Sequence, residues 1–286
     1  MNGQKLILVT GGAGFIGSHL CARLAKEGHK VISLDNYFAG SRENHIPGIE
    51  YREGHTKDIE EHIPEMPDVI YHLGEYSRVE ISLSEPALVW DLNTVGTFGV
   101  LEFWRKRGGK LIYAGSSTKF GDGGLGRVQS PYAYTKASNT EQVQNYANWY
   151  GLPYAITYFY NVYGPRERDA AHFGTLIETF RQKHLHGEPL TVVSPGTQKR
   201  NFTHVDDIVN GLMLIGEQGE GDDFGLGANE SHSVLDVANM FGGDIEMLPE
   251  RKGNRMDASL DTTKSHALGW APKKKLADYI ADIRKK

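Results

Sequence analysis

The 286-residue chain is short of cysteine, of long apolar runs and of excess positive charge. Because Cys21 is the single cysteine, no intrachain disulfide can form, and we expect neither a zinc cluster nor another metal site. No apolar run approaches the ~20 residues that a membrane-spanning helix needs. The first residues, "MNGQKLILVTGG", lead directly into a strand pattern without the apolar core of a signal peptide. We therefore expect a soluble, cytoplasmic protein.

The balance of charge argues against a nucleic-acid-binding protein. The formal net charge is −5, and the basic clusters Lys273–Lys275 and Arg284–Lys286 are short enough to be solvated surface. A hydrophobic content of 39% and a charged content of 23% are typical of a globular protein. The length allows one large α/β domain, alone or with a smaller lobe.

Short apolar runs alternate with helical spacing through the first 160 residues. The runs end at glycines or turn residues, which is typical of buried strands. Predicted strands are Lys5–Thr10, Lys30–Asp35, Asp68–Gly74, Lys110–Ser116 and Tyr154–Tyr160, and predicted helices are Phe15–Glu27, Ala87–Arg107 and Tyr132–Tyr150. This alternation predicts an α/β fold with a doubly wound parallel sheet of the Rossmann type.

After "NVYGPR" the alternation weakens. A helix is predicted at Gly174–Leu185 and a strand at Leu190–Val193. We predict that residues 1–165 form the Rossmann domain, with a return segment at about 203–217. Residues 166–202 and 218–286 would then form a smaller, substrate-binding C-terminal lobe.

A glycine-rich turn follows the first predicted strand. "VTGGAGFIGSHL" places Gly11, Gly14 and Gly17 where that strand leads into a helix, which lets the backbone and the helix N-terminus approach a pyrophosphate. Asp35 ends the next strand, where its carboxylate could bind ribose hydroxyls and repel a 2′-phosphate. A tight turn with an exposed aspartate is the simpler alternative. The combination favours a dinucleotide, and NAD over NADP.

Three hydroxyls and a lysine follow in a suggestive order. Ser116 and Ser117 end a predicted strand, and "SPYAYTK" then places Tyr132 one helical turn before Lys136. An ammonium beside a phenol would lower the phenol pKa from ~10 and prepare it to act as a base. Taken alone, the serines could be turn residues and the pair a surface accident.

Eight stretches together resemble one family. The chain is similar to the extended short-chain dehydrogenases/reductases, the NAD-dependent nucleotide-sugar epimerases and dehydratases typified by UDP-glucose 4-epimerase. The matching stretches, in family order, are "TGGAGFIGSHL", "SLDNYFAGSREN", "YHLGEYSRVEISLSEP", "LNTVGTFGVLE", "SPYAYTK", "YNVYGPR", "GEPLTVVSPGTQKRNFTHVDDI" and "LDTTKSHALGW". They run from residue 8 to about 270, and they indicate the family more strongly than the substrate.

The resemblance implies roles for individual residues. Tyr132 would be the base, Lys136 would hold the nicotinamide ribose and tune the phenol, and Ser116, with Ser117 beside it, would bind the reacting oxygen. Implied NAD contacts are Gly11, Gly14, Phe15, Ile16, Gly17, Asp35, Asn36, Leu73, Gly74, Glu75, Asn93, Tyr132, Lys136 and Tyr160. Implied contacts to a nucleotide-diphosphate sugar are Ser77, Asn161, Thr191, Arg200, Arg251 and Arg255. Surface salt bridges are the alternative for each arginine.

Departures from the family pattern bear on the reaction. Dehydratases of this type carry an Asp-Glu pair directly after the hydroxyl residue, and decarboxylases keep the glutamate. Here those positions are Ser117 and Thr118, which cannot act as carboxylates. Lys119 follows where an aliphatic residue is usual.

Other departures concern the pockets. Glu75 stands where a small residue is usual, close to the presumed nicotinamide site. "HTKD" at His55–Asp58 replaces an acidic contact to the adenine. The loop between Gly121 and Pro131 is shorter than in most relatives, and it normally borders the sugar.

The sequence therefore predicts an NAD-dependent nucleotide-sugar epimerase that inverts a carbon, presumed to be C4, through a transient keto intermediate. Another enzyme of the same family (a 4,6-dehydratase, decarboxylase or 4-dehydrogenase/reductase) stays open, as does a non-catalytic NAD sensor. The base, the sugar and the inverted carbon stay undetermined.

Relatives pair two helices into a four-helix dimer interface, and we expect a homodimer here. The helices near Ala87–Arg107 and Tyr132–Tyr150 carry large apolar residues that fit this use. They include Leu101, Phe103, Trp104, Tyr146 and Trp149. The alternative is that these residues all face the chain's own sheet.

Overall fold

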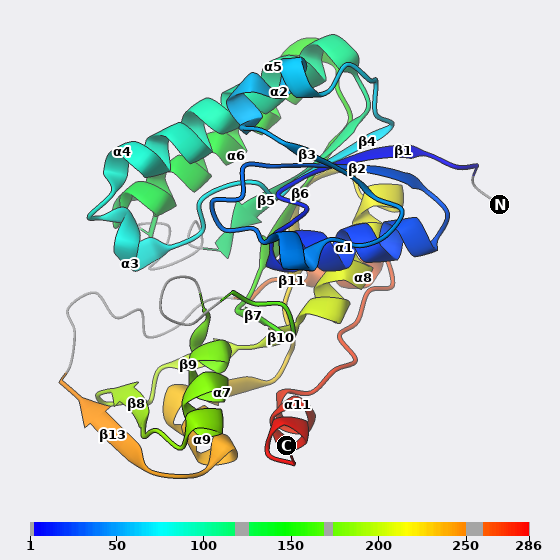
Figure 1. Ribbon diagram of the computed structural model, residues 1–286. Helices are drawn as coiled ribbons and strands as arrows, with labels where there is room; N and C mark the ends of the chain where they lie inside the picture. Colours follow the sequence, from blue (N-terminus) through cyan, green and yellow to red (C-terminus); the bar gives the residue numbers. More distant parts are fainter. Residues whose placement is uncertain (1–2, 118–125, 169–173, 250–259, 286) are drawn as a thin grey trace.

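The computed structural model describes residues 3–117, 126–168, 174–249 and 260–285. Its centre is a seven-stranded parallel sheet with the order β11-β6-β5-β4-β1-β2-β3 (Figure 1). The strands are β1 (Leu6–Thr10), β2 (Lys30–Asp35), β3 (Glu50–Glu53), β4 (Val69–His72), β5 (Lys110–Ser116), β6 (Tyr154–Phe159) and β11 (Gly221–Leu226). The predicted doubly wound α/β fold is confirmed. The order reverses between β1 and β4, which is where such sheets bind ligands.

Helices cover both faces of this sheet (Figure 1). On one face α1 (Phe15–Lys26) packs against α8 (Val205–Gln218), with Trp270 in the same apolar core. On the other face α2 (Ile59–His62), α5 (Gly96–Arg107) and α6 (Pro131–Tyr150) share a second core. Within the described ranges, no helix is both long and apolar enough to cross a membrane.

A continuous helical segment, here called the helical rod, runs along the outside of the sheet face that α2, α5 and α6 cover. It consists of α4 (Pro86–Val89), a π-helical stretch η3 (Trp90–Val95) and α5. The short helix α3 (Val79–Ser82) precedes it. The rod lies beside α6, so two long helices form the outermost layer here (Figure 1).

The start of α6 is set by local chemistry. Ser130 caps the helix, because its Oγ accepts a hydrogen bond of 3.1 Å from the Ala133 N–H. Pro131 follows at the first helical position, where its missing N–H costs nothing. Gly151, with φ at 66°, ends the helix. These signals place Tyr132 in the first turn and Lys136 one turn later.

A smaller lobe is built around its own core of Phe180, Val192, Phe241 and Ile280. Its elements are α7 (Leu176–His186), β8 (Leu190–Val193), β9 (Lys199–Asn201), β12 (Ser231–Ser233), α9 (Val234–Phe241), β13 (Ile245–Leu248) and α11 (Leu276–Ile283). The remaining short elements are η1 (Arg42–Asn44), η2 (Thr56–Asp58), β7 (Val162–Tyr163), β10 (Thr203–His204) and α10 (Thr263–Ala267). β8 pairs with β13, β9 with β12, and β7 with β10.

The structure differs from the predicted organisation at both edges of the large sheet. β3 was not predicted, and β11 lies in the sheet beside β6 although residues 218–286 were expected in the lobe. Both are edge strands with few apolar residues, "EYRE" and "GDDFGL", so neither has the apolar run of a buried strand. The return to the large domain thus extends beyond residue 217, and the rest of the division stays a prediction.

Three of the five residues expected at a dimer interface are core residues instead. Leu101, Phe103 and Trp104 are fully buried in the core under the chain's own sheet, so that prediction was wrong for them. Tyr146 is 8% exposed, whereas Trp149 is 65% exposed. Helical spacing marks an apolar face but does not say whether the sheet or another chain covers it.

We expect Trp104→Ala to lower the free energy of unfolding by about 3–5 kcal/mol, because it removes a fully buried indole. It also removes the hydrogen bond of 3.0 Å from Nε1 to the Gly109 carbonyl. Urea denaturation of the variant and the parent measures the change. Trp149→Ala is the matched control and should change stability by no more than about 0.5 kcal/mol. Equal losses in the two variants would contradict the assignment of Trp104 to the core.

Candidate active site

A cleft of about 660 Å³ lies at the carboxyl ends of the sheet strands, at the switch point. Most residues predicted to contact NAD, and two predicted to contact the substrate, line it. They are Gly11, Gly14, Phe15, Ile16, Gly17, Asp35, Asn36, Leu73, Gly74, Glu75, Ser77, Tyr132, Lys136 and Asn161. Segments that are far apart in the sequence therefore meet in one cavity, as a single binding site requires.

The turn between β1 and α1 needs glycine at two positions. Gly11 has φ at 73°, and a Cβ there would lie 2.9 Å from the Gly74 Cα. A Cβ on Gly17 would lie 2.0 Å from the Gly11 carbonyl oxygen. Gly14 precedes α1 and offers no side-chain cap, so backbone N–H groups of the first turn face the cleft. Such an end attracts an anion.

Asp35 is held at the edge of this cleft. Its carboxylate accepts hydrogen bonds from the Ala13 N–H at 3.0 Å and the Tyr37 N–H at 2.8 Å. Burial raises the pKa of Asp35, and these two N–H groups oppose the rise. The glycine turn, the start of α1 and this carboxylate fit the pyrophosphate and adenosine ribose of NAD.

Of the stretch "HTKD" at His55–Asp58, which was expected at the adenine contact, only Thr56 lines the cleft. His55 does not line the cleft but points to Asp91, with 3.2 Å between Nε2 and Oδ2. The histidine in "HTKD" therefore serves local structure, and its Nδ1 accepts a hydrogen bond of 3.0 Å from the Lys57 N–H at the start of η2.

Tyr132 and Ser116, two of the proposed catalytic residues, contact each other in the structure. The Tyr132 hydroxyl donates a hydrogen bond of 3.2 Å to Ser116 Oγ at the end of β5, and Ser117 follows directly. Burial raises the pKa of Tyr132 and so does the Glu75 carboxylate, while the Ser116 hydrogen bond and the Arg78 charge lower it. The phenol is thus in place to exchange a proton with a molecule in the cleft.

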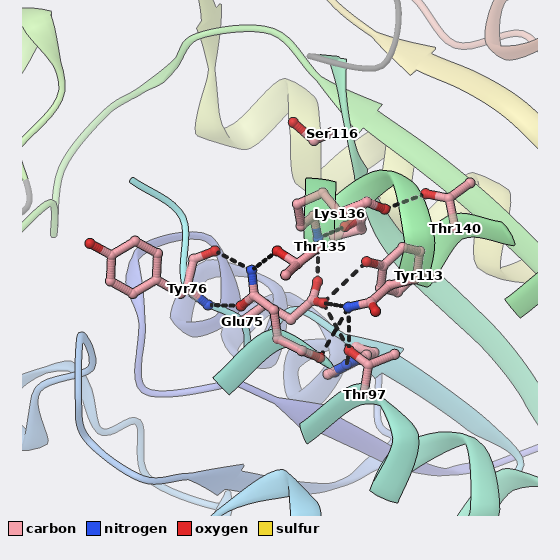
Figure 2. A network of polar contacts seen from close by, with 12 residues as sticks. Glu75, Tyr76, Thr97, Tyr113, Ser116, Thr135, Lys136 and Thr140 are labelled. Atoms are coloured by element: carbon pink, nitrogen blue, oxygen red, sulfur yellow. Dashed lines mark hydrogen bonds and ion pairs between the residues drawn. The ribbon is translucent and has the colours of Figure 1, made fainter. Parts of the chain in front are cut away.

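Lys136 has an ionic partner that the sequence did not predict. Its ammonium faces the carboxylate of Glu75 and also donates to the Ala114 carbonyl (Figure 2). The two charged side chains are 6% and 3% exposed, respectively. The ammonium also lies 4.5 Å from the centre of the Tyr113 ring.

A ring of donors surrounds the second oxygen of Glu75 (Figure 2). Oε1 accepts hydrogen bonds from Thr97 Oγ1 at 2.8 Å, Asn139 Nδ2 at 2.7 Å and the Tyr113 hydroxyl at 3.1 Å. Burial opposes ionisation of Glu75, but the Lys136 charge and these donors outweigh it and lower its pKa. Glu75 is therefore a carboxylate, and its charge is fully engaged by protein groups.

His72 extends this network without adding a charge. Its Nδ1 lies 2.7 Å from Thr10 Oγ1, and its Nε2 lies 2.9 Å from Thr97 Oγ1. Complete burial lowers the pKa of His72 to about 4, so the ring is neutral at pH 7. Since Thr97 donates its proton to Glu75, His72 Nε2 carries the proton that Thr97 accepts.

The net shift of the Tyr132 pKa is upward, with burial as the largest cause, so a lowering by Lys136 stays a prediction. The lysine charge is paired with Glu75. The spacing in "SPYAYTK" located both side chains correctly on α6. It carried no information on the carboxylate, which follows β4 some 60 residues earlier.

Two residues predicted to bind NAD lie behind the cleft wall instead. Asn93 is fully buried, and its side chain holds the backbone of Tyr76. Asn93 Oδ1 accepts a hydrogen bond of 2.6 Å from the Tyr76 N–H. Tyr160 is 2% exposed and packs in the core of the second sheet face. Neither lines the cleft.

The predicted substrate residues are divided. Asn161 lines the cleft, with φ at 39° and an Nδ2 hydrogen bond of 3.0 Å to the Asn201 carbonyl. Thr191 and Arg200 lie in β8 and β9 of the lobe and do not line the cleft. Arg251 and Arg255 lie outside the described residues, as do Thr118, Lys119 and residues 121–125 of the Gly121–Pro131 loop.

Five charged residues that line the cleft were not predicted: Glu43, Arg78, Arg166, Glu167 and Arg168. Arg78 lies three residues after Glu75, and burial lowers its pKa. Glu167 directly follows "NVYGPR" and accepts hydrogen bonds from Thr175 N–H at 2.9 Å and Oγ1 at 3.2 Å. Burial raises the pKa of Glu167 to about 7. The available signal was that Arg78 lies within the matched stretch "YHLGEYSRVEISLSEP" and that Glu167 directly follows "YNVYGPR".

Residues 7–227 match the NAD dependent epimerase/dehydratase family. The chain belongs to this family. It is an enzyme of the NAD-dependent nucleotide-sugar epimerase/dehydratase type, and its cofactor is NAD. The glycine turn, Asp35, Tyr132 and Lys136 stand in the order that the resemblance predicted, which confirms that recognition.

Similar proteins of this family carry out different reactions. A putative UDP-glucose 4-epimerase of Methanocaldococcus jannaschii is 31% identical, over 97% of this chain and 97% of its own length. UDP-glucuronic acid decarboxylase 1 of Xenopus tropicalis is 30% identical, over 94% of this chain and 69% of its own. The crystal structure of Thermotoga maritima UDP-glucose 4-epimerase with UDP-glucose has a TM-score of 0.91 and 30% identity, with 98% of this chain and 97% of that chain covered.

We expect NAD to bind more tightly than NADP by about tenfold or more, because a 2′-phosphate would lie against the Asp35 carboxylate. A tenfold difference in affinity corresponds to about 1.4 kcal/mol of binding free energy. Isothermal titration of both cofactors measures the ratio. Asp35→Asn removes the charge and keeps one of the two acceptor oxygens, so it should narrow the ratio of the NAD and NADP affinities. A parent enzyme with equal affinities would show that Asp35 does not select the cofactor.

Proposed function

We propose that this enzyme is an NAD-dependent nucleotide-sugar 4-epimerase. The observation that supports this most directly is the Tyr132 hydroxyl, which lines the cleft and is hydrogen-bonded to Ser116 at 3.2 Å. The next residues in the chain are Ser117 and Thr118, where elimination would need carboxylates. Removal and return of a hydride needs one proton-transfer group, and Tyr132 with Ser116 meets that need.

The proposed substrate is a hexose linked to uridine diphosphate. Relatives that cover nearly the whole chain are named for UDP-glucose and UDP-glucuronic acid. In the cleft, Asn161 offers a side-chain amide to the diphosphate, and Ser77 also lines the cleft. Arg200, Arg251 and Arg255 stay proposed diphosphate ligands, since a guanidinium suits phosphate oxygens.

The chain's own residues suit the following steps. Ionised Tyr132 takes the proton from the C4 hydroxyl, and Ser116 holds the same oxygen as it becomes a carbonyl. NAD, when bound, supplies the chemistry of taking up a hydride from C4 and returning it. After the keto sugar has turned in the cleft, Tyr132 returns the proton to the oxygen, so no net oxidation occurs. Gly11, Gly14 and Asp35 would hold the cofactor.

A decarboxylase or dehydratase is the competing function within the family. Glu75 does not favour it, because its carboxylate is bound by Lys136, Thr97, Asn139 and Tyr113. Glu167 is the observation in its favour, because its carboxyl lines the cleft with a pKa raised to about 7 by burial. Incubation with UDP-glucose and UDP-glucuronic acid separates the two functions: an epimerised product supports our proposal, and carbon dioxide release refutes it.

We expect Tyr132→Phe to lower turnover by about 10²–10⁴-fold while NAD binding survives, because the variant lacks the hydroxyl that transfers the proton. Ser116→Ala should lower turnover by a smaller factor, and Ser117→Ala by the smallest factor of the three. The assay is conversion of UDP-glucose, the first candidate substrate, followed by chromatography. Tyr134→Phe is a matched control on the same helix, since Tyr134 is 45% exposed and does not line the cleft. Wild-type turnover in Tyr132→Phe would remove Tyr132 from the mechanism.

We also propose a homodimer, through residues other than those first expected. Exposed aromatic residues lie on the outermost helices: Trp90 in η3 is 49% exposed, Phe98 in α5 50% and Tyr134 in α6 45%. Trp90 and Tyr134 stack with 6.3 Å between ring centres. A second copy would cover these rings and bury apolar surface. A cytoplasmic location stays part of the proposal.

Light scattering should give twice 31.8 kDa at micromolar concentration. We expect Phe98→Glu to shift the mass towards the monomer, because it places a charge in an apolar interface. Met66→Glu is the control, since Met66 is 66% exposed and belongs to none of these helices but to the connection between α2 and β4. A monomer mass for the parent protein would refute the dimer.

A further inference from the structure

Glu75 and Lys136 form an almost fully buried ion pair in the wall of the cleft that Tyr132 also lines. Their side chains are 3% and 6% exposed. Isolated charges at such depth would cost several kcal/mol each, so each charge depends on the other. Glu75 follows β4 and lies outside "SPYAYTK" on α6, so the pair is not part of the Tyr-x-x-x-Lys motif.

The charged groups around the Tyr132 phenol come from different elements. Lys136 lies one turn along α6, Glu75 follows β4, and Arg78 precedes α3. Glu75 raises the pKa of Tyr132 and Arg78 lowers it, after burial as the largest cause. Glu167 acts on Arg78 from the segment after β7, and His72 beside Glu75 is neutral. Glu75 and Lys136 together thus contribute no net charge beside the phenol.

We propose that Glu75 is a positioning residue that acts on Tyr132 through Lys136, by cancelling the charge of the lysine and fixing its ammonium against β5. Ionisation of the phenol then depends on the pair and not on the lysine alone. The fixing is visible in Lys136, which donates to both Glu75 and the Ala114 carbonyl of β5 (Figure 2). The inference concerns the base of the proposed function but can be tested without turnover.

The test is a double-mutant cycle read by the Tyr132 pKa. Tyrosine labelled with ¹³C at Cζ is titrated by NMR in the NAD-loaded protein, and Tyr132→Phe identifies the resonance among the 14 tyrosines. Glu75→Gln should lower the Tyr132 pKa by about one unit, because an uncompensated ammonium then faces the phenol. Glu75→Gln/Lys136→Met should stay within about half a unit of the parent, because both charges are gone.

Two results would overturn the proposal. One is an unchanged Tyr132 pKa in Glu75→Gln. The other is a rise of the Tyr132 pKa by about one unit in the double variant, which would mean that Lys136 alone determines the pKa of the phenol. The double variant buries no lone charge, so it keeps the test valid if Glu75→Gln unfolds. Glu65→Gln is the matched control, because it breaks the pair with Arg52 on the far edge of the sheet and should leave Tyr132 unchanged.

The outcome is separate from that of the epimerase proposal. The NMR titration reports the electrostatics of the phenol whether or not any sugar is converted. If the cycle behaves as expected and no nucleotide sugar is epimerised, the proposed reaction fails and the role of Glu75 stands. If epimerisation occurs and the double-mutant cycle does not show the expected pKa changes, the proposed reaction stands and the role of Glu75 is refuted.

Discussion

The buried ion pair of Glu75 and Lys136 is the interaction on which the geometry of the active site depends. Neither charge is tolerable alone at that depth, so both side chains must meet and must be surrounded by donors. Those donors come from β5 (Tyr113), α5 (Thr97) and α6 (Asn139). The hydrogen bonds to the Glu75 carboxylate therefore hold α5 and α6 in place on the sheet. Because Tyr132 belongs to α6, they also hold Tyr132 in its position in the cleft.

The pair also shows what the motif in "SPYAYTK" specifies and what it does not. The motif specifies where the phenol and the ammonium lie, because one helical turn joins them and Ser130 sets where the helix begins. It does not specify the charge that the phenol experiences, which depends on residues from other segments. Glu75 and Arg78 have opposite effects on Tyr132, and neither belongs to the motif.

The sequence predicted well wherever a local signal and the tertiary structure agree. Strands β1, β2 and β5 have apolar runs that glycine or turn residues end, and the cleft residues Gly11, Gly17 and Asp35 follow from one turn and one strand end. Prediction failed where the deciding contact is distant. Leu101 is covered by the chain's own core, Asn93 bonds to the Tyr76 backbone rather than facing the cleft, and β11 is a polar edge strand that gains its place by pairing with β6.

The same constraint bears on which chemistry the cleft can perform. A carboxylate held by one ammonium and three neutral donors cannot exchange protons with a substrate without exposing a buried charge, which costs several kcal/mol. Glu75 is therefore removed from the set of acids and bases, although it lines the cavity. Tyr132 with Ser116 then remains next to the sheet ends, and a single group that takes and returns one proton suits reversible oxidation at one carbon. Elimination would need a second acid, and Glu167 lines the cleft with a pKa raised to about 7, which would allow it to act as one.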